Sequence, residues 1–234
     1  GPTNLLVDTT YYWKVVEVNE AEATSVWAGD VWSFTTPEYL VVDDFESYTD
    51  DMDADEAVFQ TWIDGWEDDT NGSVVGYDPA PFTEQTLIHG GRQSMPVAYD
   101  NSGTASTSET KYTFATPQDW TQHGVTTLVL FFRGQTANSP GPLYLKINNT
   151  KVPYNGDAGD IKRTQWLPWN IDLASTGASL TNVTKLVIGV EGAGAVGTLY
   201  FDDIELQGTA PEFITPVDPG TVGLAAWYKF DGDL

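Results

Sequence analysis

The chain has 234 residues and a formal net charge of −24, from 34 Asp and Glu against 10 Lys and Arg. A field of this sign repels phosphate, which excludes nucleic acids and anionic membranes as partners. The absence of Cys excludes disulfides and thiolate metal sites, and the absence of an apolar run of about 18 residues predicts no membrane insertion. Nine Trp, 11 Tyr and ten Phe are enough for a core and leave aromatic rings over for a binding face.

The first predicted elements are two antiparallel strands within residues 9–36. Apolar and polar residues alternate with a period of two on either side of a loop at 20–30. The pattern resembles the last two strands of a fibronectin type III domain, so residues 1–37 are interpreted as the C-terminal hairpin of such a domain. An isolated hairpin is marginal in water. We therefore expect the central domain or neighbouring copies of the chain to cover these strands.

Two stretches far apart in the sequence carry the same chemistry. Residues 41–48 and 199–206 each place paired carboxylates among β-branched and aromatic residues, as strands do. Buried carboxylates need a cation or several hydrogen bonds, and if the two strands pair, Ca²⁺ is the expected cation. The candidate metal ligands are Asp43, Asp44, Glu46, Asp202 and Asp203.

Strand alternation narrows this set, because only one acid of each pair can point inward. Asp202 shares its parity with the apolar Ile204, and Glu46 lies opposite in parity to Phe45, so we expect Glu46 and Asp202 to be the main ligands. Residues 64–72 and 155–160 are weaker calcium-loop candidates, for which a plain turn is the competing interpretation. The 14 acids and no Lys or Arg between positions 43 and 91 fit either calcium loops or an acidic solvated surface.

The paired acidic strands resemble the opening and closing strands of carbohydrate-binding modules with the galactose-binding-like jelly-roll fold. The resemblance covers residues 40–207 and implies a structural calcium. Between these limits, strands are predicted at 94–100, 125–134, 143–147, 166–173 and 185–190, with at most a short helix at 54–63. Strands separated by turns in this way predict an all-β fold, a two-sheet antiparallel jelly-roll sandwich with partial β flanks.

Sugar recognition needs aromatic faces that stack on pyranose rings, with polar groups nearby for the hydroxyls. Four aromatic residues lie among turn-forming Gly, Pro and Asp, where a core strand is not expected. Two further polar residues follow Gly90 and Gly91. The candidate ligand-binding residues are Trp62, Trp66, Tyr77, Phe82, Arg92 and Gln93. Trp120, Trp166 and Trp169 are alternatives for which core packing is the simpler explanation.

The chain offers little for catalysis. His89 and His123 lie in loops without a hydrolase or zinc-protease motif around them. Residues 192–197 match the dinucleotide fingerprint G-x-G-x-x-G, but a predicted strand follows where the fingerprint needs a helix, so the match is interpreted as a hairpin loop. We therefore expect no enzyme activity, with a glycoside hydrolase fragment as one alternative because carboxylates are abundant.

The C-terminal part is predicted to hold a Pro-rich linker at 208–222 and a strand at 223–234 that resembles the start of a laminin-G-like, concanavalin-type domain. Together the resemblances imply a non-catalytic carbohydrate-binding or adhesion module of a larger secreted or cell-surface bacterial protein, with a polysaccharide or glycan as partner. The other alternative is the repeat unit of an extracellular filament or surface layer, assembled by strand exchange between copies.

Overall fold

The computed structural model describes residues 4–18 and 26–208. The predicted laminin-G-like strand at 223–234, and the predicted linker from residue 209 onward, lie outside these residues. In the described part no helix is long and apolar enough to cross a membrane.

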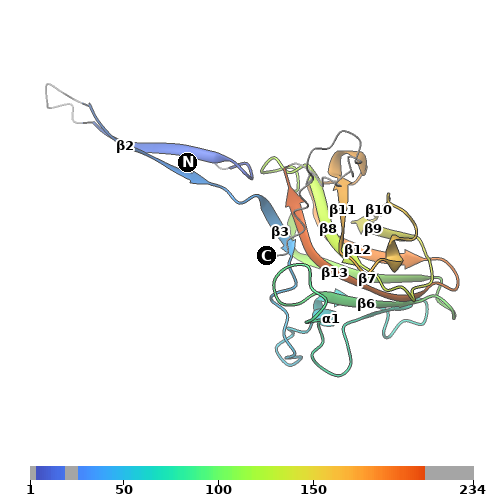
Figure 1. The fold of residues 1–234 in the computed structure, drawn as a ribbon. Helices are drawn as coiled ribbons and strands as arrows, with labels where there is room; N and C mark the ends of the chain where they lie inside the picture. The colour runs from blue at the N-terminus through green and yellow to red at the C-terminus, as the bar shows by residue number, and fades with distance from the viewer. Residues whose placement is uncertain (1–3, 19–25, 209–234) are drawn as a thin grey trace, which may run out of the picture.

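The chain forms an N-terminal hairpin and a β-sandwich body (Figure 1). The hairpin consists of β1 (Thr10–Val18) and β2 (Val26–Thr35). The body contains β3 (Tyr39–Asp43), α1 (Val58–Thr61), β4 (Trp62–Ile63), β5 (Ser73–Val75), β6 (Met95–Asp100), β7 (Thr107–Gln118), β8 (Thr127–Arg133), β9 (Leu143–Ile147), β10 (Thr150–Pro153), β11 (Leu167–Asp172), β12 (Val183–Glu191) and β13 (Val196–Gln207), with 3₁₀ turns at Asp160–Lys162 and Leu173–Ser175.

Two antiparallel sheets make up the body. One has the strand order β10-β9-β12-β7-β4 and is called the β7 sheet here. The other has the order β11-β8-β13-β6-β5, with β3 also paired to β13, and is called the β8 sheet. The prediction of an all-β, two-sheet antiparallel jelly-roll sandwich is confirmed. The fibronectin assignment of the hairpin stays a prediction.

The core lies between the two sheets, because alternate residues of the central strands point inward. On β8 these are Leu128, Leu130 and Phe132, and on β12 they include Leu186 and Ile188, all at most 2% exposed. These are the strands whose apolar runs were clearest in the sequence. Burial of these side chains is the main stabilising term for such a sandwich.

The first and last strands of the body pair, as the sequence predicts. Ile204 lies opposite Asp43 in the antiparallel β3–β13 ladder. A bulge interrupts β13 between Asp202 and Glu205, and Asp203 there has a φ of 43°. A bulge re-aims side chains, so these neighbouring acids meet different surroundings.

Residues 192–195 of the glycine-rich segment 192–197 join β12 to β13, and a strand rather than a helix follows, which confirms that the match to the dinucleotide fingerprint is false. Gly192 and Gly194 have φ values of 108° and 80°, which L side chains rarely adopt. These two glycines thus allow the backbone to turn between β12 and β13.

Candidate functional site

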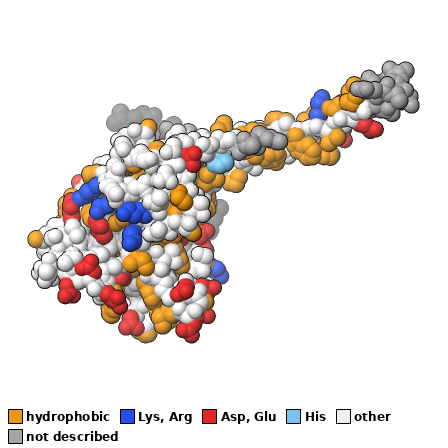
Figure 2. Space-filling model, turned by 180° about the vertical axis from the view of Figure 1, so that it is seen from behind, with side chains coloured by type: hydrophobic (Ala, Val, Ile, Leu, Met, Phe, Trp, Pro, Cys, Tyr) orange, Lys and Arg blue, Asp and Glu red, His pale blue; other side chains and the backbone are white. Residues whose placement is uncertain are grey.

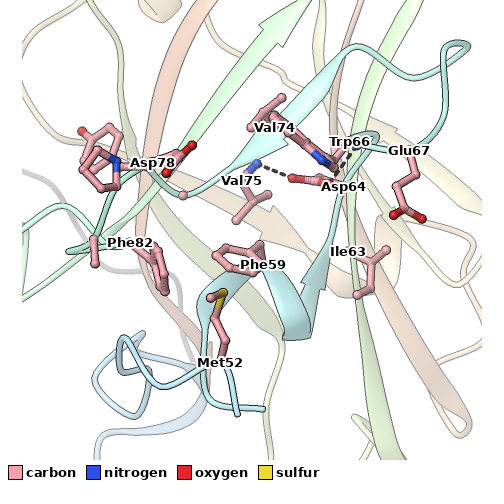
Figure 3. A pocket seen from close by; sticks show the side chains of 14 residues that line it. Met52, Phe59, Ile63, Asp64, Trp66, Glu67, Val74, Val75, Asp78 and Phe82 are labelled. Atoms are coloured by element: carbon pink, nitrogen blue, oxygen red, sulfur yellow. Dashed lines mark hydrogen bonds between the residues drawn. The ribbon is translucent and has the colours of Figure 1, made fainter. Parts of the chain in front are cut away.

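A pocket opens where β4, β5 and α1 meet the loops that follow β4 and β5 (Figure 3). Its volume is about 650 Å³, within the range of about 300–1,000 Å³ that is usual for small-molecule sites. It is lined by Met52, Phe59, Ile63, Asp64, Trp66, Glu67, Val74, Val75, Gly76, Tyr77, Asp78, Pro79, Ala80 and Phe82. Three of the six ligand-binding residues predicted from the sequence, Trp66, Tyr77 and Phe82, are among them.

Trp66 stands at this pocket with 74% of its surface exposed. The loop that carries it is fixed by Asp64, whose carboxylate accepts N–H bonds from Trp66 at 3.0 Å and from Val75 at 2.6 Å (Figure 3). Gly65 lies so close to the backbone of Asn71 that a Cβ would come within 2.1 Å of its carbonyl oxygen. An exposed indole on a loop held this tightly is an available stacking surface.

Tyr77 forms another part of the lining, with 36% of its surface exposed. Its hydroxyl donates to Glu84 Oε2 at 2.6 Å. Although desolvation opposes ionisation of Glu84, hydrogen bonds from Thr86, Tyr77 and the backbone of Leu87 lower the pKa of this carboxyl to about 2. Glu84 is thus charged at neutral pH and holds the Tyr77 ring in place.

Phe82 closes the apolar side of the pocket. Its ring packs edge-on against Phe59, with 5.0 Å between centroids, and its backbone N–H donates to Asp50 Oδ1 at 2.8 Å. Only 9% of Phe82 is exposed. It therefore supplies an apolar wall, whereas Trp66 and Tyr77 supply accessible faces.

Trp62 does not belong to the site, and its prediction as a ligand-binding residue is corrected. The side chain has no exposed surface. Its Nε1 donates to Asp43 Oδ2 at 2.8 Å, and its ring packs against Phe45 and Tyr112. The Gly and Asp neighbours that suggested a loop belong to the short β4 and the turn after it.

Arg92 and Gln93 do not line the pocket. Gln93 is buried, and its Nε2 donates to the carbonyl oxygens of Phe45 at 2.6 Å and Tyr48 at 2.9 Å. This structural role corrects its prediction as a ligand-binding residue. Arg92 is exposed and its Nε lies 3.1 Å from Glu46 Oε2, so its charge is directed to the acidic strand end rather than to the pocket.

The five predicted metal ligands accept hydrogen bonds from N–H and O–H groups. Asp43 accepts from Phe45 N, Tyr48 Oη and Trp62 Nε1, and Asp44 Oδ1 accepts from Glu46 N at 3.1 Å. Glu46 Oε1 accepts from the backbone N–H groups of Arg92 at 2.7 Å and Gln93 at 3.1 Å.

On the closing strand, Asp202 Oδ2 accepts from the backbone N–H groups of His89 at 2.8 Å and Gly90 at 3.3 Å. Asp203 Oδ2 lies 2.6 Å from His89 Nδ1. The loop 89–93 therefore runs between the acids of the first and last strands and supplies donors to both.

This arrangement does not fit a calcium site as it stands. Among the described residues no group of three or more His, Asp or Glu side chains is placed to hold a metal ion. A hard cation needs free oxygen ligands, whereas these carboxylates face N–H donors. Calcium at Glu46 and Asp202 stays a prediction, and so does calcium at the two candidate loops.

Sequence reasoning missed a second polar and aromatic cluster, formed by residues of β8, β11 and β13. Arg133 lies opposite Tyr200 in the ladder, with its guanidinium 5.7 Å from the ring centroid. Arg133 Nε and Asn170 Oδ1 are buried side-chain atoms without a hydrogen-bond partner within the described part of the chain. Buried polar atoms are normally satisfied. Only the cross-strand pairing places these residues on one face, so the sequence offered no local signal.

No protein-family model matches the chain, and no curated protein matches it. Among solved structures, the family 11 carbohydrate-binding module of Clostridium thermocellum, in complex with a β-1,3-1,4-mixed-linked tetrasaccharide, is 15% identical with a TM-score of 0.44, over 73% of this chain and 95% of that one. A family 30 carbohydrate-binding module is 15% identical with a TM-score of 0.42, over 63% and 89%.

A β-1,2-glucanase from Parabacteroides distasonis also matches, at 15% identity and a TM-score of 0.40, over 58% of this chain but only 24% of the enzyme. Two of these three solved structures are carbohydrate-binding modules, the class of protein that the sequence resembles. The predicted fibronectin and laminin-G-like flanks stay predictions.

Proposed function

We propose that the chain is a non-catalytic carbohydrate-binding module and that the pocket beside Trp66 receives the sugar. One observation carries the proposal: an indole with 74% of its surface exposed stands at a pocket of about 650 Å³ that also contains Tyr77 and Phe82. Trp66, Tyr77 and Phe82 give the concave site an aromatic lining, which is typical of small-molecule sites.

The pocket offers the two kinds of contact that a sugar ring needs. The faces of Trp66 and Tyr77 can stack on the apolar side of a pyranose. The carboxylates of Glu67 and Asp78 lie on the same lining and are exposed, so they can accept hydrogen bonds from hydroxyl groups. Stacking supplies affinity, and the polar contacts select the orientation of the ring.

A glycan array with the recombinant chain, followed by calorimetric titration of the best ligand, tests the proposal. We expect Trp66→Ala and Tyr77→Ala to weaken binding at least about tenfold each, which corresponds to about 1.4 kcal/mol. Trp32→Ala is the matched control, because Trp32 is also exposed, at 52%, but lies on the hairpin. No binding to any glycan, or equal losses in all three variants, would contradict the proposal.

The wider context also belongs to the proposal: a module of a larger secreted or cell-surface bacterial protein that binds polysaccharide or mediates adhesion. The hairpin favours a second candidate function. Tyr12, Trp13, Val15, Val31 and Trp32 are between 46% and 73% exposed on a two-stranded ribbon with open edges. Such edges can pair with another copy, as the filament alternative requires.

A further inference from the structure

All charged side chains that line the pocket are acidic. Its lining includes three carboxylates, Asp64, Glu67 and Asp78, and contains no Lys, Arg or His. Figure 3 shows Glu67 and Asp78 towards opposite ends of the lining, with the apolar side chains of Phe59 and Val75 between them.

Further acidic residues lie beside the pocket. A shallow hollow of about 480 Å³ shares Met52 with the pocket and is lined by Thr49, Asp50, Asp51 and Asp53. Positions 43 to 91 contain 14 acids and no Lys or Arg, and Lys111 of the neighbouring strand β7 lies opposite the lining residue Ile63. Charges beyond about 8 Å are largely screened at physiological salt. The three carboxylates of the lining, opposed by the single charge of Lys111 beside Ile63, therefore dominate the field that a bound ligand meets.

The three carboxylates differ in what they are free to do. Asp64 already accepts N–H bonds from Trp66 and Val75 and holds the loop. Glu67 and Asp78 are exposed, so they can turn toward a ligand at little cost. A neutral sugar would gain only ordinary hydrogen bonds from them, and an anionic sugar would be repelled.

From these observations we propose that the pocket selects a glycan with protonated amino groups. The apolar face of the amino-sugar ring stacks on Trp66 or Tyr77, and its ammonium group pairs with Glu67 or Asp78. Aromatic faces attract cations as well as sugar rings, so both kinds of contact favour the same ligand. The inference rests on the proposed function and adds the substrate class.

A cationic peptide is the main competing ligand. The walls favour a ring over a slim lysine side chain, because Trp66 and Tyr77 offer flat, accessible surfaces and the pocket volume of about 650 Å³ exceeds the needs of a methylene chain. The peptide is therefore included in the test.

Three β-1,4-linked tetrasaccharides make a matched set of probes: the glucosamine, N-acetylglucosamine and glucose tetramers, which differ only in the group at C2. Titration at a pH that protonates the amine, in low salt, should show at least about tenfold tighter binding of the glucosamine tetramer. The advantage should shrink in high salt and disappear at a pH where the amine is neutral.

Glu67→Gln and Asp78→Asn should each weaken binding of the glucosamine tetramer severalfold and weaken binding of the neutral tetramers by a smaller factor, because the neutral sugars lose a hydrogen-bond acceptor but no ion pair. Both residues are exposed, so folding should be unaffected, and melting curves check this. Glu191→Gln is the control, because it makes the same charge change on β12, outside the pocket lining.

The outcomes separate the two proposals. Equal affinity for all three tetramers, or tighter binding of a neutral glycan, would overturn the amino-sugar inference and leave the proposed function standing. A tetralysine peptide that binds as tightly as the glucosamine tetramer would also overturn it. If no tetramer and no array glycan binds, the proposed function itself fails.

Discussion

Single carboxylates stabilise local structure in this acidic chain, and Glu84 is the clearest example. Its Oε1 accepts from Thr86 N at 2.6 Å and Leu87 N at 3.1 Å, and its Oε2 accepts from Tyr77 Oη at 2.6 Å. These bonds favour the charged form and lower the pKa of Glu84 to about 2. One residue thereby shapes both the 84–87 turn and the aromatic face of Tyr77.

We expect Glu84→Gln to lower the free energy of unfolding at pH 7 by about 1–2 kcal/mol, the strength of charge-assisted hydrogen bonds reduced for partial exposure. The pKa of Glu84 in the folded chain is below the ordinary Glu value of 4.5, so this stabilisation is present above pH 4.5 and is lost as the pH falls toward 2. Urea unfolding of wild type and variant across this range measures it. A difference that stays constant with pH would contradict the assignment, and Glu56→Gln serves as a control on another acid, which is exposed.

The acids of the first and last strands allow a direct test of the predicted calcium. If Glu46 and Asp202 hold Ca²⁺, calcium at 100 times its dissociation constant stabilises the fold by about 2.7 kcal/mol. The melting temperature of the wild type should then be higher in excess calcium than in EDTA. The Glu46→Gln/Asp202→Asn double variant should show no such difference. Equal melting temperatures in both buffers would mean that the N–H donors of the 89–93 loop are sufficient.

At the scale of elements, the loop from Asp64 to Ser73 positions Trp66 through a close backbone approach. A Cβ on Gly65 would lie 2.1 Å from the carbonyl oxygen of Asn71, so Gly65→Ala must displace the loop. We expect a loss of stability of about 1–3 kcal/mol, the range for overpacking, together with weaker glycan binding. Gly103→Ala is the control, because a Cβ there meets no atom within 4 Å. Unchanged stability and binding of Gly65→Ala would show that the loop adapts freely.

The elements that were predictable from sequence are those whose apolar pattern is strong. The runs in β8 and β12 define core strands without further information, and the matched acids of β3 and β13 predicted their pairing. The strand β7 was not predicted, because its composition is polar. Glu109, Lys111 and Thr113 alternate along the strand with residues that are more buried. Short β4 and β5 have too few residues for a period to show.

The candidate site was predictable only where chemistry and turn residues coincide. Aromatic residues among Gly, Pro and Asp pointed to Trp66 and Tyr77, which the structure places in the lining of the pocket, and their role in binding stays a prediction. The same signal failed for Trp62, because its buried bond to Asp43 joins residues 19 positions apart. Arg133 and Tyr200 meet only through strand pairing, which a single sequence does not reveal.

For the whole molecule we expect no enzyme activity. His89 is held by Asp203 and its ring stacks on Phe131, with 3.6 Å between centroids, and the imidazole of His123 contacts the carbonyl oxygen of Leu5 at 2.7 Å. We expect no release of reducing sugar from common polysaccharides. Release above background that is lost on substitution of one carboxylate would support the glycoside hydrolase alternative.

The base of the hairpin is attached to the body, whereas its two faces are exposed. Val7 N donates to the carbonyl oxygen of His123 at 3.0 Å, and Asp8 N donates to that of Pro37 at 2.8 Å. Further along, Trp13 and Trp32 pack edge-on with 4.6 Å between centroids, yet they remain 46% and 52% exposed. Figure 2 shows orange, apolar side chains along an arm that projects from the body.

An apolar surface of this kind is rarely left uncovered in a soluble monomer, so we expect copies of the chain to associate through the hairpin. Light scattering should give a mass that rises with concentration, and Trp13→Ser/Trp32→Ser should return the chain to a monomer. Head-to-tail pairing of open edges grows into a filament unless it closes into a ring, which electron microscopy distinguishes. A monodisperse monomer whose hairpin is readily cleaved by protease would rule out the filament alternative and leave the hairpin to be covered by a neighbouring domain.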